Sequence, residues 1–88
     1  MTDMQTETLA LLAPGESAVV QRLTVDGTMR RRFLDIGLIE GTSVECIGKS
    51  PGGDPSAYLI RGAVIAIRKS DCRGIRITQR KREGVPWD

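Results

Sequence analysis

The stretch TMRRRFLDIGLIEGTSV, residues 28–44, predicts a short amphipathic helix that ends in a turn and leads into a strand. Met29 and Phe33 stand four residues apart, so both lie on one apolar face of a helix over residues 28–36. Gly37 stands where a left-handed residue commonly ends a helix. Because the remainder of the chain reads as strands and turns, we expect this helix to be the main one.

The ends of this helix can be read from single residues. Thr28 is a suitable N-cap, because its hydroxyl can accept a hydrogen bond from a free backbone N–H of the first turn. Arg31 and Asp35 are spaced i, i+4 and can pair on the solvent side. After a turn over residues 38–42, we expect a strand over residues 43–49, in which alternate side chains point to opposite faces.

The other strands predict a small, mainly β domain. Short β-branched or alternating segments cover residues 16–25, 58–60, 63–68 and 75–79, and Arg61-Gly62 predicts a hairpin turn between two of them. Residues 7–13, which are rich in Leu and end at Pro14-Gly15, predict a helical turn that packs on the domain as a lid. We therefore expect a five-stranded β-barrel with one helix between its first two strands.

Composition favours a binding module over an enzyme. The chain has 88 residues, 13 Lys+Arg, 11 Asp+Glu and no His, so a single domain with a formal charge of +2 is expected. Without His it lacks the usual general base near neutral pH, the commonest transition-metal ligand and any Ser–His or Cys–His nucleophile pair. The three aromatic residues stand too far apart to form a stacking platform for single-stranded nucleic acid.

The chain divides into an expected flexible N-terminus at residues 1–8, a domain at residues 9–79 and a basic mobile tail at residues 80–88. Its first residues lack the basic region of a signal peptide, and no apolar run approaches the ~20 residues of a membrane span. We expect a cytoplasmic protein. Its two cysteines are then expected to stay reduced and to fill the core rather than form a bridge.

Metal binding has one weak candidate in the sequence. Asp71 and Cys72 are adjacent, and Cys72 can be exposed there, so the pair could hold Fe²⁺ or Zn²⁺ at the surface. Cys46 shares a strand face with Val44, which predicts burial. No carboxylate pair has the spacing of a metal site, so we expect no resident cofactor and at most weak transition metal ion binding.

Four motifs in order resemble the FeoA family, ferrous iron transport protein A. Residues 30–44 carry a basic pair, an apolar helix end, Gly-Leu, Gly-Thr and an apolar strand, and they match the signature of that family. The other three are LAPGE at residues 12–16, Gly53-Asp54-Pro55, and RGAVIAIR at residues 61–68. The resemblance covers residues 9–79.

The resemblance implies an SH3-like β-barrel and a role in bacterial ferrous iron uptake. FeoA is a small cytosolic accessory to the membrane transporter FeoB, on whose G-protein domain it is thought to act by direct contact. The same barrel occurs in iron- and manganese-dependent repressors of the diphtheria toxin repressor type, but this chain lacks their DNA-binding helices. The resemblance thus implies a non-enzymatic partner of FeoB that reaches the membrane only through the transporter.

The expected contacts lie at the helix end and in a neighbouring loop. Arg31, Arg32 and Asp35 would make electrostatic contacts, with Leu38 as the apolar one. The loop at Gly53-Asp54 would present a further contact, since binding residues often lie on loops held by a rigid scaffold. Each of these residues also has an interpretation that involves no partner. The charged helix residues can form a solvated face, Leu38 and Ile39 can be buried in the core, and the loop can be a tight turn only.

The charge is unevenly distributed along the chain. Residues 61–82 hold eight Lys or Arg and one Asp, a local charge of +7, whereas residues 1–29 sum to −3. This polarity leaves open a small basic module that binds nucleic acid through phosphates. The simpler interpretation is a solvated sheet face, on which Arg61, Arg68 and Arg76 lie opposite the inward isoleucines, and we therefore do not expect nucleic acid to be the main partner. A metal-responsive regulatory domain is a further alternative, and a homo-oligomer that pairs through edge strands is possible.

Overall fold

The computed structural model describes residues 7–82, and within them the chain forms six strands. The strands are β1 (Glu7–Thr8), β2 (Glu16–Leu23), β3 (Ser43–Lys49), β4 (Ser56–Ile60), β5 (Ala63–Ile67) and β6 (Ile75–Arg82). Three helical segments connect them: the 3-10 helix η2 (Leu9–Leu11), α1 (Gly27–Asp35) and α2 (Lys69–Cys72). The predicted mainly β fold is confirmed, but the expected number of strands was too low by one.

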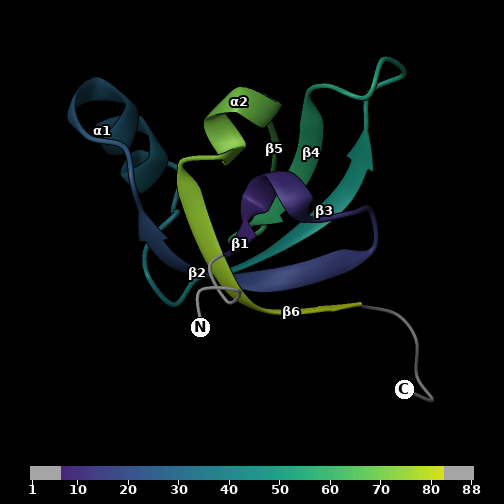
Figure 1. The fold of residues 1–88 in the computed structure, drawn as a ribbon, viewed down its shortest axis with the longest axis horizontal. Coiled ribbons are helices and arrows are strands. Elements are labelled where there is room, and N and C mark those ends of the chain that lie inside the picture. Colours follow the sequence, from purple (N-terminus) through teal and green to yellow (C-terminus); the bar gives the residue numbers. More distant parts are fainter. Residues whose placement is uncertain (1–6, 83–88) are drawn as a thin grey trace.

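The strands form one bent antiparallel sheet (Figure 1) in the order β1-β6-β2-β3-β4-β5. Register shifts interrupt the pairing of β2 with β6 and of β3 with β4. Such bulges increase local twist and bend the strand, which lets the sheet curl around its own core. The curl does not close into the expected barrel, because β1 and β5 have a sheet neighbour on one side only.

The sheet extends into segments that were expected to be flexible. β1 pairs with β6 through Glu7 and Ile77, and β6 continues to Arg82, which lies opposite Glu16. The Nε atom of Arg80 lies 3.4 Å from Oε1 of Glu7. Residues 7–8 and 80–82 therefore belong to the domain, while residues 1–6 and 83–88 of the predicted terminal segments lie outside the described residues.

Helix α1 starts and pairs differently from the prediction. It begins at Gly27, after the extended residue Asp26, and its N-cap makes no side-chain hydrogen bond, so Thr28 is not the cap. Within residues 7–82 Arg31 and Asp35 form no ion pair. Exposed i, i+4 pairs contribute only a few tenths of a kcal/mol, so their absence costs the helix little.

The predicted helix end at Gly37 is confirmed. Gly37 has φ +100° and donates its N–H to the carbonyl of Leu34 at 3.0 Å, while Leu38 donates to the carbonyl of Phe33 at 2.9 Å. These two bonds form a Schellman motif, in which a left-handed residue turns the chain back across the last helical turn. The motif directs Leu38 inward.

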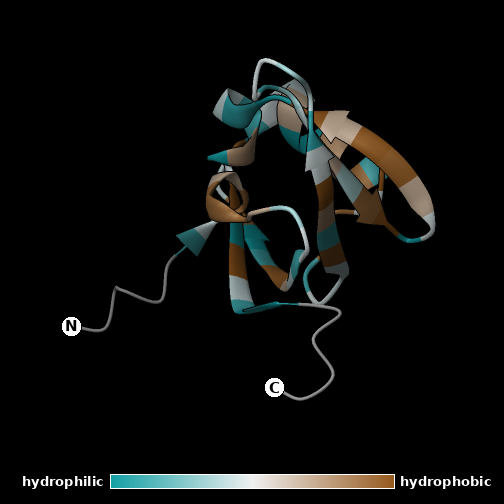
Figure 2. Ribbon diagram, turned by 90° about the vertical axis from the view of Figure 1, so that its right-hand side faces the viewer, coloured by the Kyte–Doolittle hydropathy of each residue, from teal (hydrophilic) through white to brown (hydrophobic). Residues whose placement is uncertain are grey.

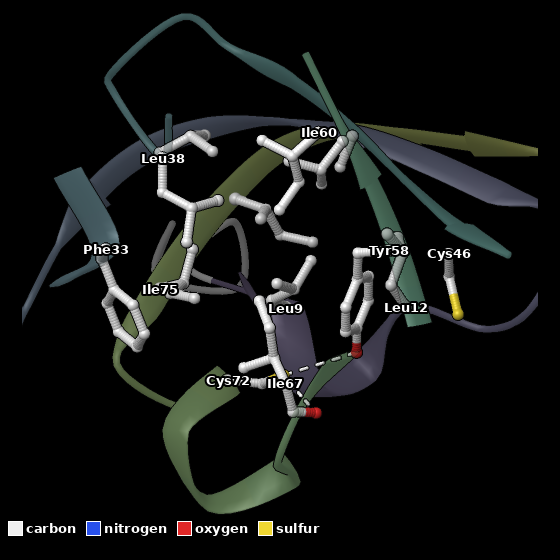
Figure 3. Packing of buried hydrophobic residues seen from close by; sticks show 14 residues of the cluster. Leu9, Leu12, Phe33, Leu38, Cys46, Tyr58, Ile60, Ile67, Cys72 and Ile75 are labelled. Atoms are coloured by element: carbon white, nitrogen blue, oxygen red, sulfur yellow. Dashed lines mark hydrogen bonds between the residues drawn. The ribbon is translucent and has the colours of Figure 1, made fainter. Parts of the chain in front are cut away.

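The core lies on the concave side of the sheet (Figure 3). Its buried apolar residues are Leu9, Leu12, Ala18, Val20, Phe33, Leu38, Val44, Cys46, Tyr58, Ile60, Ile67, Cys72, Ile75 and Ile77. The lid predicted from residues 7–13 is confirmed in part: Leu9 and Leu12 are buried there, but Leu11 is 57% exposed and Glu7–Thr8 form strand β1. Figure 1 shows η2 inside the curve of the sheet, next to α2, which it contacts.

The predicted hairpin is also confirmed, and it joins β4 to β5 at Arg61 and Gly62, whose φ values are +51° and +86°. Figure 2 colours most of this hairpin brown, because both strands are apolar. Across residues 7–82, none of the helices is both long enough and apolar enough to cross a membrane.

Candidate interaction site

A groove of about 250 Å³ lies between α1 and the edge strand β5. Its apolar lining comes from Met29 and Phe33 of α1, from Ile36 directly after that helix, and from Ile65, Ala66 and Ile67 of β5. The helical spacing of the first three residues and the two-residue spacing of the isoleucines turn each set toward the same side. In Figure 3, Phe33 and Ile67 lie at the border of the buried cluster. The groove is thus an opening at the margin of the core.

Charged side chains border this apolar lining. Arg32 comes from α1, Arg68 follows β5, and Asp71 belongs to α2. In the part of the chain that the structure describes, neither arginine forms an ion pair. The lining therefore carries two positive charges and one negative charge, and both guanidinium groups are free to bind a carboxylate of another molecule.

The structure separates the predicted contact residues on the helix. Arg32 lines the groove, whereas Arg31 and Asp35 are exposed on α1 outside it. Leu38 is fully buried, so its predicted role as an apolar surface contact is wrong, because the Schellman motif points it into the core. Its neighbour Ile39 is 47% exposed. Spacing alone could not tell which of these adjacent residues faces solvent.

The loop before β4, with the predicted contacts Gly53 and Asp54, does not line the groove but has a structural role. Oδ1 of Asp54 accepts a hydrogen bond of 2.8 Å from the backbone N–H of Lys69, the first residue of α2. Gly53 has φ +90° and donates to the carbonyl of Ser50 at 2.7 Å, which confirms a tight turn with a left-handed glycine. Asp54 therefore holds the start of α2, and with it Asp71, near β5.

The cysteines lie inside the molecule. Both are free and buried, as the core-filler prediction required, so the idea that Cys72 is exposed beside Asp71 is wrong. Sγ of Cys72 donates to the hydroxyl oxygen of Tyr58 at 3.4 Å. Burial raises the pKa of both thiols and of the Tyr58 phenol, so all three are neutral near pH 7.

Metal ligands do not gather in the described part of the chain. Among residues 7–82, no group of three or more Cys, Asp or Glu side chains is placed to hold a metal ion. Cys72 would have to lose its contact with Tyr58 and its proton to ligate a metal together with Asp71. The groove, by contrast, offers apolar surface and guanidinium groups, which suit a protein partner.

Sequence reasoning missed Arg68 and the whole role of β5. The available signal was the run AVIAI at residues 63–67, which has a charged residue directly after it. Read as a strand, it indicated only its hairpin partner and not what lies on its other side. Only the strand order shows that it lies at the sheet edge, and only the packing shows that it faces α1.

Comparison with known proteins gives consistent matches. Residues 7–79 match the FeoA domain. A curated relative, the Fe(2+) transport protein A/Fe(2+) transporter FeoB fusion protein of Porphyromonas gingivalis, is 29% identical over 69 residues. That match covers 78% of this chain but 8% of the fusion protein, so this chain spans only a small part of its relative.

Solved structures share the fold. The iron(II) transport protein A of Clostridium thermocellum is 29% identical with a TM-score of 0.78, and the match covers 82% of this chain and 44% of that chain. The zinc-complexed FeoA of Stenotrophomonas maltophilia, described as a procaryotic SH3 domain protein, is 25% identical with a TM-score of 0.80 and covers 89% and 99%. The SH3-like fold is thereby confirmed.

The family match spans all the elements from β1 into β6, including α1, the hairpin and the groove between them. It also contains the four motifs on which the resemblance rested. This protein belongs to the FeoA domain family.

Proposed function

We propose that this protein is a non-enzymatic accessory protein of bacterial ferrous iron transport. It acts by binding the cytosolic G-protein part of a FeoB-type transporter. The observation that carries the proposal is the Porphyromonas gingivalis relative, in which Fe(2+) transport protein A and FeoB are one polypeptide. Joining two domains covalently raises the effective concentration of each near the other, which is advantageous where the domains interact.

The site chemistry supports binding rather than catalysis. The groove offers apolar side chains and two guanidinium groups, and both thiols are buried with a raised pKa. A buried neutral thiol is a poor nucleophile and a poor metal ligand. The related Stenotrophomonas maltophilia protein is described as a possible bacterial ferrous iron transport activating factor. A regulatory contact on the cytosolic side of the transporter fits both observations.

The proposal is tested by calorimetric titration of the full chain into FeoB from the same organism, embedded in lipid nanodiscs. The titration is repeated with GDP and with a non-hydrolysable GTP analogue, and empty nanodiscs are the control. We expect saturable binding that depends on the nucleotide. Heat equal to the control in every nucleotide state, together with no co-elution on gel filtration, would refute the proposed function.

A further inference from the structure

We propose that the partner docks by adding a strand to the free edge of β5. The added strand would be an extended segment with apolar residues at alternate positions and an acidic residue near its end. Its inward side chains would fill the groove between β5 and α1. This inference rests on the proposed function, because the cytosolic part of the transporter would supply the segment.

The hairpin turn shows which backbone groups of β5 are free. A two-residue turn closes on a hydrogen-bonded pair, here Ile60 and Ala63, and bonded pairs then recur at every second residue. Residues 63, 65 and 67 therefore bond to β4, while the N–H and C=O groups of Val64 and Ala66 point away from it. In the sheet formed by residues 7–82, β5 has no neighbour on that side.

This edge lacks the usual protection against strand addition. Natural edge strands carry charges, proline or bulges, or they are very short. β5 has five apolar residues, and its pairing with β4 runs without a register shift. The opposite edge strand, β1, has only two residues. Of the two edges, β5 is therefore the one that offers an uninterrupted, apolar ladder to another strand.

Charge argues for a partner other than a second copy of the chain. Arg61 lies in the turn before β5, and Arg68 and Lys69 follow its last residue. Antiparallel pairing of two copies would therefore bring the positive charges at one end of β5 close to those at the other end of the second copy, and such like charges repel. Both ends of β5 are flanked by positive charge, so an incoming strand with acidic flanking residues matches this edge better.

The groove supplies the side-chain part of the recognition. Alternate residues of an added strand point to opposite faces, so one set continues past Val64 and the other enters the groove beside Phe33 and Ile36. Arg32 and Arg68 can then bind a carboxylate of the segment from both sides of the groove. Asp71 is the acidic lining residue, and it repels a carboxylate of the segment at the end of the groove where Asp71 lies.

The backbone part of the proposal is tested with Val64→Pro. This change removes an N–H that faces away from β4, where an edge strand tolerates proline, and leaves the ladder to β4 intact. Val64→Ala is the matched control, since it keeps the N–H and shortens the same exposed side chain. In titrations against nanodisc-embedded FeoB, we expect Kd to rise by about tenfold or more for Val64→Pro and by less than about twofold for Val64→Ala.

The charge part is tested with Arg32→Glu and Arg68→Glu, each expected to raise Kd by about tenfold. Arg31→Glu is the control, because Arg31 is exposed on the same helix outside the groove. If wild-type protein binds and Val64→Pro binds equally well, strand addition is wrong while the proposed function stands. If wild-type protein does not bind at all, the proposed function itself fails.

Two measurements keep the proposal testable should a variant misfold. Hydrogen exchange of the wild-type chain reports the amides of Val64 and Ala66 directly, and we expect both to become protected when FeoB is added. Unchanged exchange at these two amides overturns the proposal. Analytical ultracentrifugation tests the alternative occupant: a wild-type dimer that Val64→Pro dissociates would show that a second copy fills the edge, against our inference.

Discussion

Leu38→Ala separates a core role of this residue from a contact role. Leu38 is fully buried, and its position depends on the Schellman motif that ends α1. Removing three carbons at about 0.8 kcal/mol each gives a transfer term of about 2.4 kcal/mol, to which the cavity adds. We expect a loss of about 3 kcal/mol in the free energy of unfolding. The matched control is Ile39→Ala, since Ile39 is 47% exposed.

The assay for this pair is urea unfolding followed by circular dichroism. With an m-value of about 1–1.5 kcal/mol/M, the low end for small proteins, Leu38→Ala lowers the urea midpoint by about 2–3 M. At about 4–8 °C per kcal/mol, the melting temperature falls by about 12–24 °C. We expect Ile39→Ala to cost less than about 1 kcal/mol.

The core role of Leu38 would be refuted by a Leu38→Ala variant that has unchanged stability but binds the transporter more weakly. Leu38 would then be the surface contact that its place at the helix end first indicated, and the burial derived from the Schellman motif would be wrong. A loss of stability with unchanged Kd for the folded fraction supports the core role.

Three further predictions concern the remaining buried and capping groups. Asp54→Ala removes the carboxylate that accepts from the N–H of Lys69, and we expect it to cost about 1 kcal/mol in urea unfolding, whereas a cost of zero would show that α2 needs no cap. Burial raises the pKa of the Cys72 thiol in the folded state above its ordinary value of 9.0. The contribution of this thiol to the free energy of unfolding is therefore constant below pH 9 and decreases as the pH rises above 9. The urea midpoint should therefore be lower at pH 10 than at pH 8, and this fall should be smaller for Cys72→Ala. An equal fall in both proteins would contradict the assignment of the effect to Cys72. Zn²⁺ or Fe²⁺ under reducing conditions should leave the melting temperature unchanged, because Cys72 is buried against Tyr58, and a rise that Cys72→Ala abolishes would instead establish the surface metal site.

Elements specified by neighbouring residues were predictable from the sequence. The helix end at Gly37 depends on hydrogen bonds that span only residues 33–38, and the hairpin depends on two left-handed residues at 61 and 62. The alternation of Ile65 and Ile67 likewise indicated which side of β5 faces inward. In each case the physical cause lies within a few residues of the feature.

Features that depend on distant pairing were not predictable. β1 has two residues and exists because Glu7 and Thr8 pair with β6, nearly seventy positions away, so no local pattern marks it. The burial of Cys72 arises where α2 packs against Tyr58 and η2, although its own neighbours are polar. The candidate site shows the same division: Arg32 was predicted from the helix, and Arg68 was missed.

The sequence by itself determined the family motifs, the single main helix, the apolar strands and the lack of histidine chemistry, because these are properties of composition and short-range spacing. Tertiary structure alone decided that β5 is an edge and that Arg32, Arg68 and Asp71 border one groove. A strand is an edge only in relation to its neighbours, and a groove exists only between packed elements. The edge position of β5 and the groove both result from contacts between residues far apart in the sequence, and the spacing of neighbouring residues does not specify such contacts.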